Sequence, residues 1–137
     1  MMRVFLDTNI LVDLIADRKP FSVHAIEIFR RAETGSIQLF TSSHSLAATY
    51  DLLKKYVDER RLREILLHVM DFVEVVAVDR DALQKGLRSR HKDLEDAIQI
   101  VCASSISGLS CIVTRNVRDF KTSEIAVLTP DEFSLKH

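Results

Sequence analysis

Short apolar runs recur along the chain and alternate with segments of helical periodicity, and this alternation restricts the possible folds more than any other feature. The runs are rich in Val, Ile, Leu, Phe and Cys and cover residues 4–6, 37–40, 73–78, 111–113 and 126–128. Nearly continuous apolar runs are typical of strands that are buried on both faces, as in a parallel sheet covered by helices. The sequence therefore predicts an α/β fold, a three-layer α/β/α sandwich with a central, mostly parallel sheet.

The segments between these runs carry apolar residues at the spacing of amphipathic helices, and capping residues mark several of their ends. Ser22 and Asp58 are expected N-caps, and Gly35 and Gly108 are expected to close the helices that precede them. The predicted helices begin near Asn9 and then cover residues 22–34, 43–53, 58–70, 79–87 and 93–107, with a last one after Pro130. We expect a single domain over residues 1–137.

Composition excludes several classes of protein. The chain has only 3 glycines, and they are not clustered, so it cannot form a P-loop or a G-x-G-x-x-G phosphate cradle. Its 19 Lys and Arg against 20 Asp and Glu give a formal charge of −1, so binding of nucleic acid requires a local basic patch. No apolar run approaches the roughly 18 residues of a membrane span, and an acid comes too early for a signal peptide. We expect a cytoplasmic protein without membrane contact.

Several other metal and phosphate sites are disfavoured. The 5 histidines show no i, i+4 pair, and the 2 cysteines lie in apolar runs, so no zinc signature is present. Asp7 lacks the second acid, two residues further on, that a D-x-D phosphatase requires. A receiver domain is disfavoured because it needs adjacent acids after its first strand.

Acidic residues follow two predicted strands and open the helix between them. Asp7 comes directly after the first strand, Asp119 lies a few residues after the fourth, and Asp96 lies in the first turn of the preceding helix. Ligands of open parallel sheets bind beyond the carboxyl ends of the strands, so we expect these three acids to converge. Asp93 shares a helix face with Asp96, whereas Glu95 points elsewhere by about 100°.

Carboxylates that converge in this way repel each other. At a separation of about 5 Å, each pair costs roughly 3 kcal/mol at an effective dielectric of about 20. A hard divalent cation such as Mg²⁺ or Mn²⁺ relieves this repulsion with oxygen ligands, and it can activate a water for attack on a phosphodiester. The acids therefore favour a metal-dependent phosphodiesterase.

Each of these polar residues also has a purely structural interpretation. Asp7 and Asp93 are suitable helix caps, and Asp119 is suitable in a turn. Glu95 and Asp96 would interact favourably with the dipole of their helix. Three further residues could orient water or carboxylates at the site, or could act only as turn and cap residues: Asn9, Thr114 and Asn116.

Basic residues flank the acids in the sequence and predict a cationic rim for the phosphates of single-stranded RNA. The candidates precede the acidic helix or surround Asp119: Arg88, Arg90, Lys92, Arg115 and Arg118. An ordinary solvated helix face is the alternative interpretation of these charges.

Four motifs, in order, resemble those of the PIN domain family, small α/β nucleases that include the VapC-type toxins of bacterial toxin–antitoxin pairs. They cover residues 4–11, 93–97, 112–120 and 127–133, so the resemblance spans nearly the whole chain. The last motif, together with residues 92–97, resembles in particular a PIN subgroup frequent in Bacteroidetes and related bacteria.

The resemblance implies that Asp7, Asp96 and Asp119 are catalytic and bind Mg²⁺ or Mn²⁺. The secondary candidates lie beside them in the sequence: Asp93, Glu95 and Asn116. The resemblance also implies an RNA substrate, hydrolysed by metal-activated water to leave a 5′-phosphate, and a homodimer. An antitoxin protein is a further expected partner, because the apolar-rich helices between residues 43 and 71 would expose surface that a small globule need not show.

One position departs from the family pattern. PIN nucleases commonly carry a Glu on the helix after the second strand, where this chain has Ala48, with Asp51 about one turn away. A catalytically weak or inactive PIN-fold module that binds RNA or protein is therefore the alternative function. A metal phosphohydrolase that acts on small phosphate esters is a third hypothesis.

Overall fold

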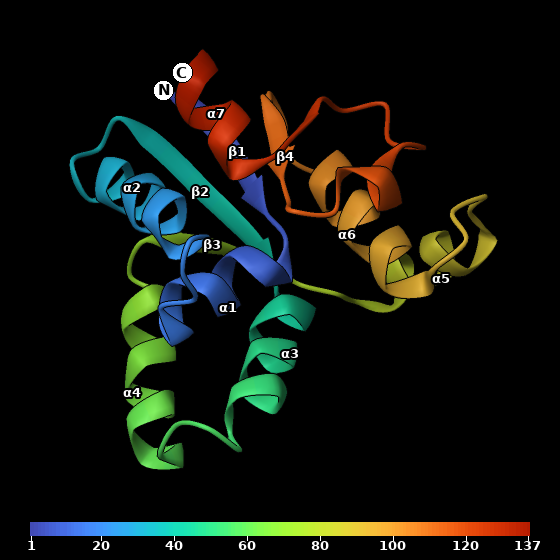
Figure 1. Ribbon diagram of the computed structural model, residues 1–137. Helices are drawn as coiled ribbons and strands as arrows, with labels where there is room; N and C mark the ends of the chain where they lie inside the picture. The colour runs from blue at the N-terminus through green and yellow to red at the C-terminus, as the bar shows by residue number, and fades with distance from the viewer.

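The computed structural model describes all 137 residues, and strands alternate with helices along most of the chain (Figure 1). In chain order the elements are β1 (Met2–Leu6), α1 (Thr8–Ala16), α2 (Ser22–Glu33), β2 (Ile37–Ser42), α3 (Ser43–Leu53), α4 (Glu59–Val69), β3 (Val73–Val76), α5 (Arg80–Arg88), α6 (Leu94–Ser104), β4 (Cys111–Val113), the 3-10 helix η1 (Val117–Phe120), β5 (Val127–Leu128) and α7 (Pro130–Lys136).

The five strands form one sheet in the order β3-β2-β1-β4-β5, and every neighbouring pair is parallel. The predicted three-layer α/β/α class is therefore confirmed. β1 lies at the centre of the sheet, and its register with β4 pairs Leu6 with Val113. The residues that follow these two strands, Asp7 and Thr114, consequently lie side by side at the carboxyl edge of the sheet.

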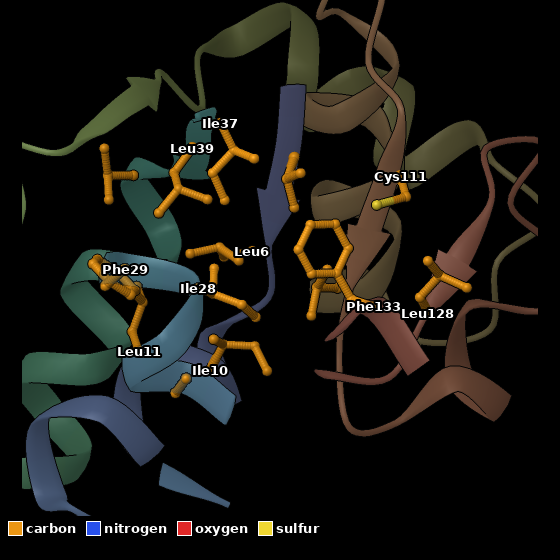
Figure 2. Packing of buried hydrophobic residues seen from close by; sticks show 14 of the residues in the cluster. Leu6, Ile10, Leu11, Ile28, Phe29, Ile37, Leu39, Cys111, Leu128 and Phe133 are labelled. Carbon is orange, nitrogen blue, oxygen red and sulfur yellow. The ribbon is translucent and has the colours of Figure 1, made fainter. Parts of the chain in front are cut away.

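The two faces of the sheet have separate hydrophobic cores, because successive side chains of a strand point to opposite sides. Val4 and Leu6 join the larger core, which α1, α2, α4 and α7 cover, and Figure 2 shows Leu6 there with Ile28 and Phe133. Phe5 joins the core on the other face, under α6 and η1. Full burial of side chains of this size contributes about 1.5–3 kcal/mol each, so the cores fix the strand ends that carry the polar residues.

Most helix boundaries follow the predicted caps. Asp58 accepts a hydrogen bond from the backbone N–H of Arg61, and Gly35 follows α2 with a φ of 80°. The prediction that Ser22 caps α2 is wrong, because Phe21 is the N-cap and Ser22 lies buried within the first turn. The helix expected over residues 93–107 ends at Ser104 with Ser105 as its C-cap, so the prediction that Gly108 closes it is wrong. The strand expected over residues 73–78 ends at Val76.

Helices α3 and α4 form a hairpin that extends away from the sheet (Figure 1). Its base is a small core of Val12, Leu53 and Leu62. Several large apolar side chains of the hairpin are exposed, as the sequence predicted: Leu52, Tyr56, Leu67 and Met70. None of the helices in the structure has the length and apolar character needed to cross a membrane.

Candidate active site

A polar pocket of about 520 Å³ opens at the carboxyl edge of the sheet, where α1, α3 and α6 meet the loop after β4. It gathers five of the residues predicted for the site, namely Asp7, Asn9, Glu95, Asp96 and Asn116. Its other lining residues are Thr8, Val12, Arg18, His44, Ala47, Ala48, Asp51, Leu52 and Gln99. Residues that are far apart in the sequence thus line one pocket beyond the carboxyl ends of the parallel strands, as predicted.

Asp7 is held at the base of this pocket by the sheet and by α1. Its backbone N–H donates to the carbonyl of Val113 at 3.0 Å, which extends the pairing of β1 with β4 by one residue. Asp7 is also the N-cap of α1, with its Oδ1 accepting from the N–H of Thr8 at 2.8 Å. The capping role and a site role are therefore compatible, and only 8% of the residue remains exposed.

Three side chains complete the contacts of the Asp7 carboxylate. Thr114 Oγ1 donates to Oδ2 at 2.7 Å, Asn9 Nδ2 lies 3.3 Å from the same oxygen, and Gln99 Nε2 donates to Oδ1 at 3.1 Å. All of these donors are uncharged, and no Lys, Arg or His forms an ion pair with Asp7. The donors fix the orientation of the carboxylate, while its charge is left without a cationic partner in the protein.

The sequence analysis missed Gln99, which is 2% exposed and links three elements. Its Nε2 also donates to Ser45 Oγ at 2.5 Å, and its Oε1 accepts from Ser42 Oγ at 2.5 Å. The Asp7 carboxylate, which only accepts, fixes which end of the amide faces it, because reversal would place the amide oxygen against a carboxylate. The only signal in the sequence is a single amide in the apolar run from 97 to 103, and a buried amide must find partners.

Asp96 lies half-buried in the first turn of α6 and faces the same pocket. The pKa of its carboxyl group is raised to about 6, mainly by burial and then by the negative charges of Asp93, Asp7, Asp119 and Glu95, in that order. All four predicted acidic neighbours are therefore close enough to Asp96 to act on its charge.

Asp93 and Asp119 lie outside the lining of the pocket. Asp93 is exposed and caps α6, with Oδ1 accepting from the backbone N–H of Asp96 at 3.1 Å. Asp119 is exposed in η1. Thr114 is fully buried and reaches the site only through Asp7, Asn9 and the N–H of Asn116.

The donor set matches a hard divalent cation, because carboxylate and amide oxygens are the groups that Mg²⁺ and Mn²⁺ prefer. No three His, Cys, Asp or Glu side chains are arranged closely enough to hold one ion together. Mg²⁺ is usually held by one or two carboxylates with waters and substrate oxygens. Asp7 and Asp96, which open into the same pocket, supply that number.

The wall of the pocket includes Ala48, the position where the family commonly has Glu. Ala48 and Asp51 both line the pocket from α3. Asp51 is exposed and lies 3.3 Å from the ammonium of Lys54. A carboxylate is thus present on this wall, one helical turn beyond the position where the family commonly has Glu.

The sequence profile of the PIN domain family matches residues 3–118. This chain belongs to the PIN domain family. The resemblance drawn from the four motifs is therefore confirmed.

Named relatives agree with this membership over nearly the whole length of the PIN domain. Ribonuclease VapC1 of Aquifex aeolicus (strain VF5) is 27% identical over 136 residues, which are 96% of this chain and 92% of VapC1. A chain of a toxin–antitoxin complex from Klebsiella pneumoniae matches 93% of this chain and 97% of its own length, at 28% identity and a TM-score of 0.67. A chain of DNA-bound VapBC from Salmonella typhimurium shares the fold, with a TM-score of 0.69 at 21% identity over 95% of this chain and 99% of its own.

Four of the predicted RNA-binding residues are exposed cations at the end of α5, in the segment before α6 and in η1, and we call them the basic rim: Arg88, Arg90, Lys92 and Arg118. None of them forms an ion pair with a carboxylate. The ring of His91 and the hydroxyl of Thr122 are hydrogen-bonded, which joins the segment before α6 to the segment after η1. The two segments that carry the basic rim are therefore in contact with each other.

Arg115, the fifth predicted cation, has an internal partner instead. Its guanidinium binds the carboxylate of Asp13 through two hydrogen bonds, at 2.6 and 3.2 Å, and lies 4.2 Å from the centre of the Phe21 ring. Asp13 is only 1% exposed. Arg115 therefore ties the loop after β4 to α1 and α2, and we do not include it in the basic rim.

Proposed function

We propose that this PIN domain is a ribonuclease that hydrolyses phosphodiester bonds with a divalent cation, Mg²⁺ or Mn²⁺. The observation that carries the proposal is the acidic pocket, in which the buried charge of Asp7 meets only neutral donors. Asp96 opens into the same pocket, and its raised pKa reflects burial and four nearby acids. A cation is the ligand that would relieve both charges.

Each residue of the pocket has a distinct part in the proposal. Asp7 and Asp96 hold the cation, and Asp119 and Asp93 contribute to the negative field from the edge. Uncharged groups orient Asp7 or its surroundings: the side chains of Asn9, Gln99 and Thr114, and the backbone N–H of Asn116. Glu95 is 3.6 Å from His44 and is a further candidate at the mouth of the pocket. A bound Mg²⁺ or Mn²⁺ would supply an activated water and neutralise charge on the phosphodiester.

RNA is the proposed substrate. A polyanion needs positive charge beside an acidic pocket, and the basic rim supplies exposed arginine and lysine side chains without protein partners. The relative from Aquifex aeolicus is named a ribonuclease and matches over nearly its whole length. Cellular RNA lies in the cytoplasm, which we propose as the place of action.

We further propose that the protein is the toxin of a toxin–antitoxin pair. The relative from Klebsiella pneumoniae, at 28% identity, is part of a toxin–antitoxin complex. The exposed apolar side chains of the α3–α4 hairpin are surface that a partner protein could cover. A homodimer remains a prediction, and light scattering of the isolated protein would test it.

Cleavage of single-stranded RNA in the presence of Mn²⁺ tests the central proposal. We expect the Asp7→Asn and Asp96→Asn variants to lose cleavage, and the Asp71→Asn variant to retain it because that exposed acid lies at the end of α4, outside the pocket. Equal cleavage by all the proteins would overturn the proposal.

A second function has one specific observation in its favour. Ala48 leaves the pocket without the Glu that the family commonly carries there, so an RNA-binding module without catalysis is the alternative. Retained RNA binding and Mn²⁺ binding without cleavage would identify this alternative. An Ala48→Glu variant that gained cleavage would then locate the defect.

A further inference from the structure

Arg18 is the only lysine or arginine among the residues that line the acidic pocket. The pocket walls also carry four acids, Asp7, Asp51, Glu95 and Asp96. A phosphate entering such a pocket meets strong repulsion unless a cation lies inside it. Arg18 is therefore the side chain of the pocket that can offset this repulsion of a phosphate.

The structure leaves the Arg18 head group almost without protein partners. Its side chain is 52% exposed, and its nearest carboxylate contact is Nε to Asp13 Oδ1 at 3.9 Å, beyond hydrogen-bonding distance. Asp13 is already satisfied by the two hydrogen bonds from Arg115. The guanidinium donors of Arg18 thus remain available for a ligand, and their planar arrangement matches the oxygens of a phosphate.

Backbone hydrogen bonds fix the main chain at Arg18. Asp17 ends α1 in the left-handed region with a φ of 50°. The N–H of Arg18 then donates to the carbonyl of Asp13 at 3.1 Å, and its own carbonyl accepts from the N–H of Ser22 at 2.8 Å. The end of α1 and the start of α2 together hold this residue at the pocket.

Arg18 and the basic rim lie on different sides of the acids. In Figure 1 the C-terminal end of α1 and the α5–α6 segment lie on opposite sides of the carboxyl end of β1. An extended polyanion that contacts both would have to cross the pocket between them. A strand held on one side only would lack this constraint on which phosphate lies at the acids.

We infer that Arg18 binds a backbone phosphate of the RNA strand inside the pocket, on the side opposite the basic rim. The inference rests on the proposed function for the identity of the polyanion. In this role Arg18 is a substrate-binding residue that sets the register of the strand. It contributes to the affinity for RNA and has no part in holding the cation.

The inference is tested by measuring how tightly a single-stranded RNA oligonucleotide binds to the Asp7→Asn variant. This substitution prevents turnover during the measurement. In this background, the second substitution Arg18→Ala should weaken RNA binding about tenfold. It should also reduce the magnitude of the slope of log affinity against log salt concentration by about 0.7, the value for one lost phosphate contact on a single strand. Arg18→Lys should keep most of the slope. Arg60→Ala is the matched control, because Arg60 is exposed on α4 without an ion pair and lies outside the pocket.

Cleavage by the otherwise unmodified protein gives a second measurement. Arg18→Ala should raise KM about tenfold with kcat changed less than about twofold, since the contact is the same in the ground state and the transition state. An unchanged salt slope and KM would overturn the role of Arg18, as would a loss that Arg60→Ala reproduces. If the wild-type protein cleaves no RNA with Mn²⁺, the proposed function fails; if it cleaves RNA and only the Arg18 effects are absent, the proposed function stands.

Discussion

Two buried carboxylates of the same helix illustrate how differently this fold treats negative charge. Asp13, in the second half of α1, is 1% exposed and is bound by both ends of the Arg115 fork. Asp7, the N-cap of α1, is 8% exposed and receives hydrogen bonds from neutral groups alone. The protein compensates the first charge itself and leaves the second to whatever enters the pocket.

The charge of Asp13 stabilises the fold through its pair with Arg115, whereas the charge of Asp7 faces the pocket. Removal of one partner of a buried ion pair strongly destabilises the folded protein, because the other charge stays buried and unpaired. The carboxylate of Asp7 has hydrogen-bond donors but no cation beside it in the protein, and it lines a pocket into which a cation can enter. Four substitutions, described from the largest expected effect to the smallest, test this distinction.

Asp13→Ala should destabilise the protein by about 3 kcal/mol or more, because the largely buried Arg115, 24% exposed, loses its partner. Urea unfolding followed by circular dichroism measures the effect. The double variant Asp13→Leu, Arg115→Met should recover part of the loss by removing both charges. A loss below about 1 kcal/mol in Asp13→Ala would contradict a structural role for the pair.

Asp7→Asn should lower RNA cleavage at least about 100-fold, which corresponds to roughly 2.7 kcal/mol in the transition state. Its effect on the free energy of unfolding should stay within about 1 kcal/mol, because the amide can still accept hydrogen bonds from Thr8 and Gln99. Parallel measurement of cleavage and urea unfolding separates the two quantities. Destabilisation as large as that of Asp13→Ala would remove the contrast between the two acids.

Gln99→Met should weaken Mn²⁺ binding about tenfold, because the side chain keeps its volume but no longer donates to Asp7 Oδ1. Calorimetric titration of Mn²⁺ measures this effect without reference to activity. Gln84→Met on α5, away from the pocket, is the matched control. Unchanged Mn²⁺ affinity in Gln99→Met would mean that the amide only fills the core.

Asp96→Asn should stabilise the metal-free protein at pH 8 by about 1 kcal/mol, a value reduced for the partial exposure of Asp96. Its folded-state pKa of about 6 lies above the ordinary 3.8, so the protonated form favours folding. The wild type therefore loses stability as the pH rises from about 4 through 6, and the variant does not. Thermal unfolding in EDTA should show no difference between them below pH 4; a less stable variant at pH 8 would contradict the cause assigned to the pKa.

The sequence was sufficient to predict the fold class and the convergence of Asp7 with Asp96. Both follow from local patterns: apolar runs define parallel strands, and parallel strands bring their following residues to one edge. Asp93 and Asp58 were recognisable as caps for the same reason, since a cap depends on a few neighbouring residues. The family resemblance singled out Ala48 as the position where the family commonly has Glu, and Ala48 lines the pocket.

The contacts that distinguish Asp7 from Asp13 could not be read in this way. Arg115 and Asp13 are 102 residues apart, and Gln99 and Asp7 are 92 apart. Whether such pairs meet depends on the rotation of α1 and α6 about their axes and on the path of the loop after β4, which periodicity does not specify. For this reason Arg115 was predicted to face RNA, and Gln99 and Arg18 were not recognised as pocket residues.

The central position of β1 has a consequence for synthesis of the protein. Asp7 leaves the ribosome long before Thr114 and Asp96, yet its carboxylate acquires its neighbours only when β4 and α6 dock beside β1. Strand β4, which pairs with β1, is translated only after the segment from 37 to 110. A chain of this topology therefore completes the surroundings of Asp7 only when translation is nearly finished.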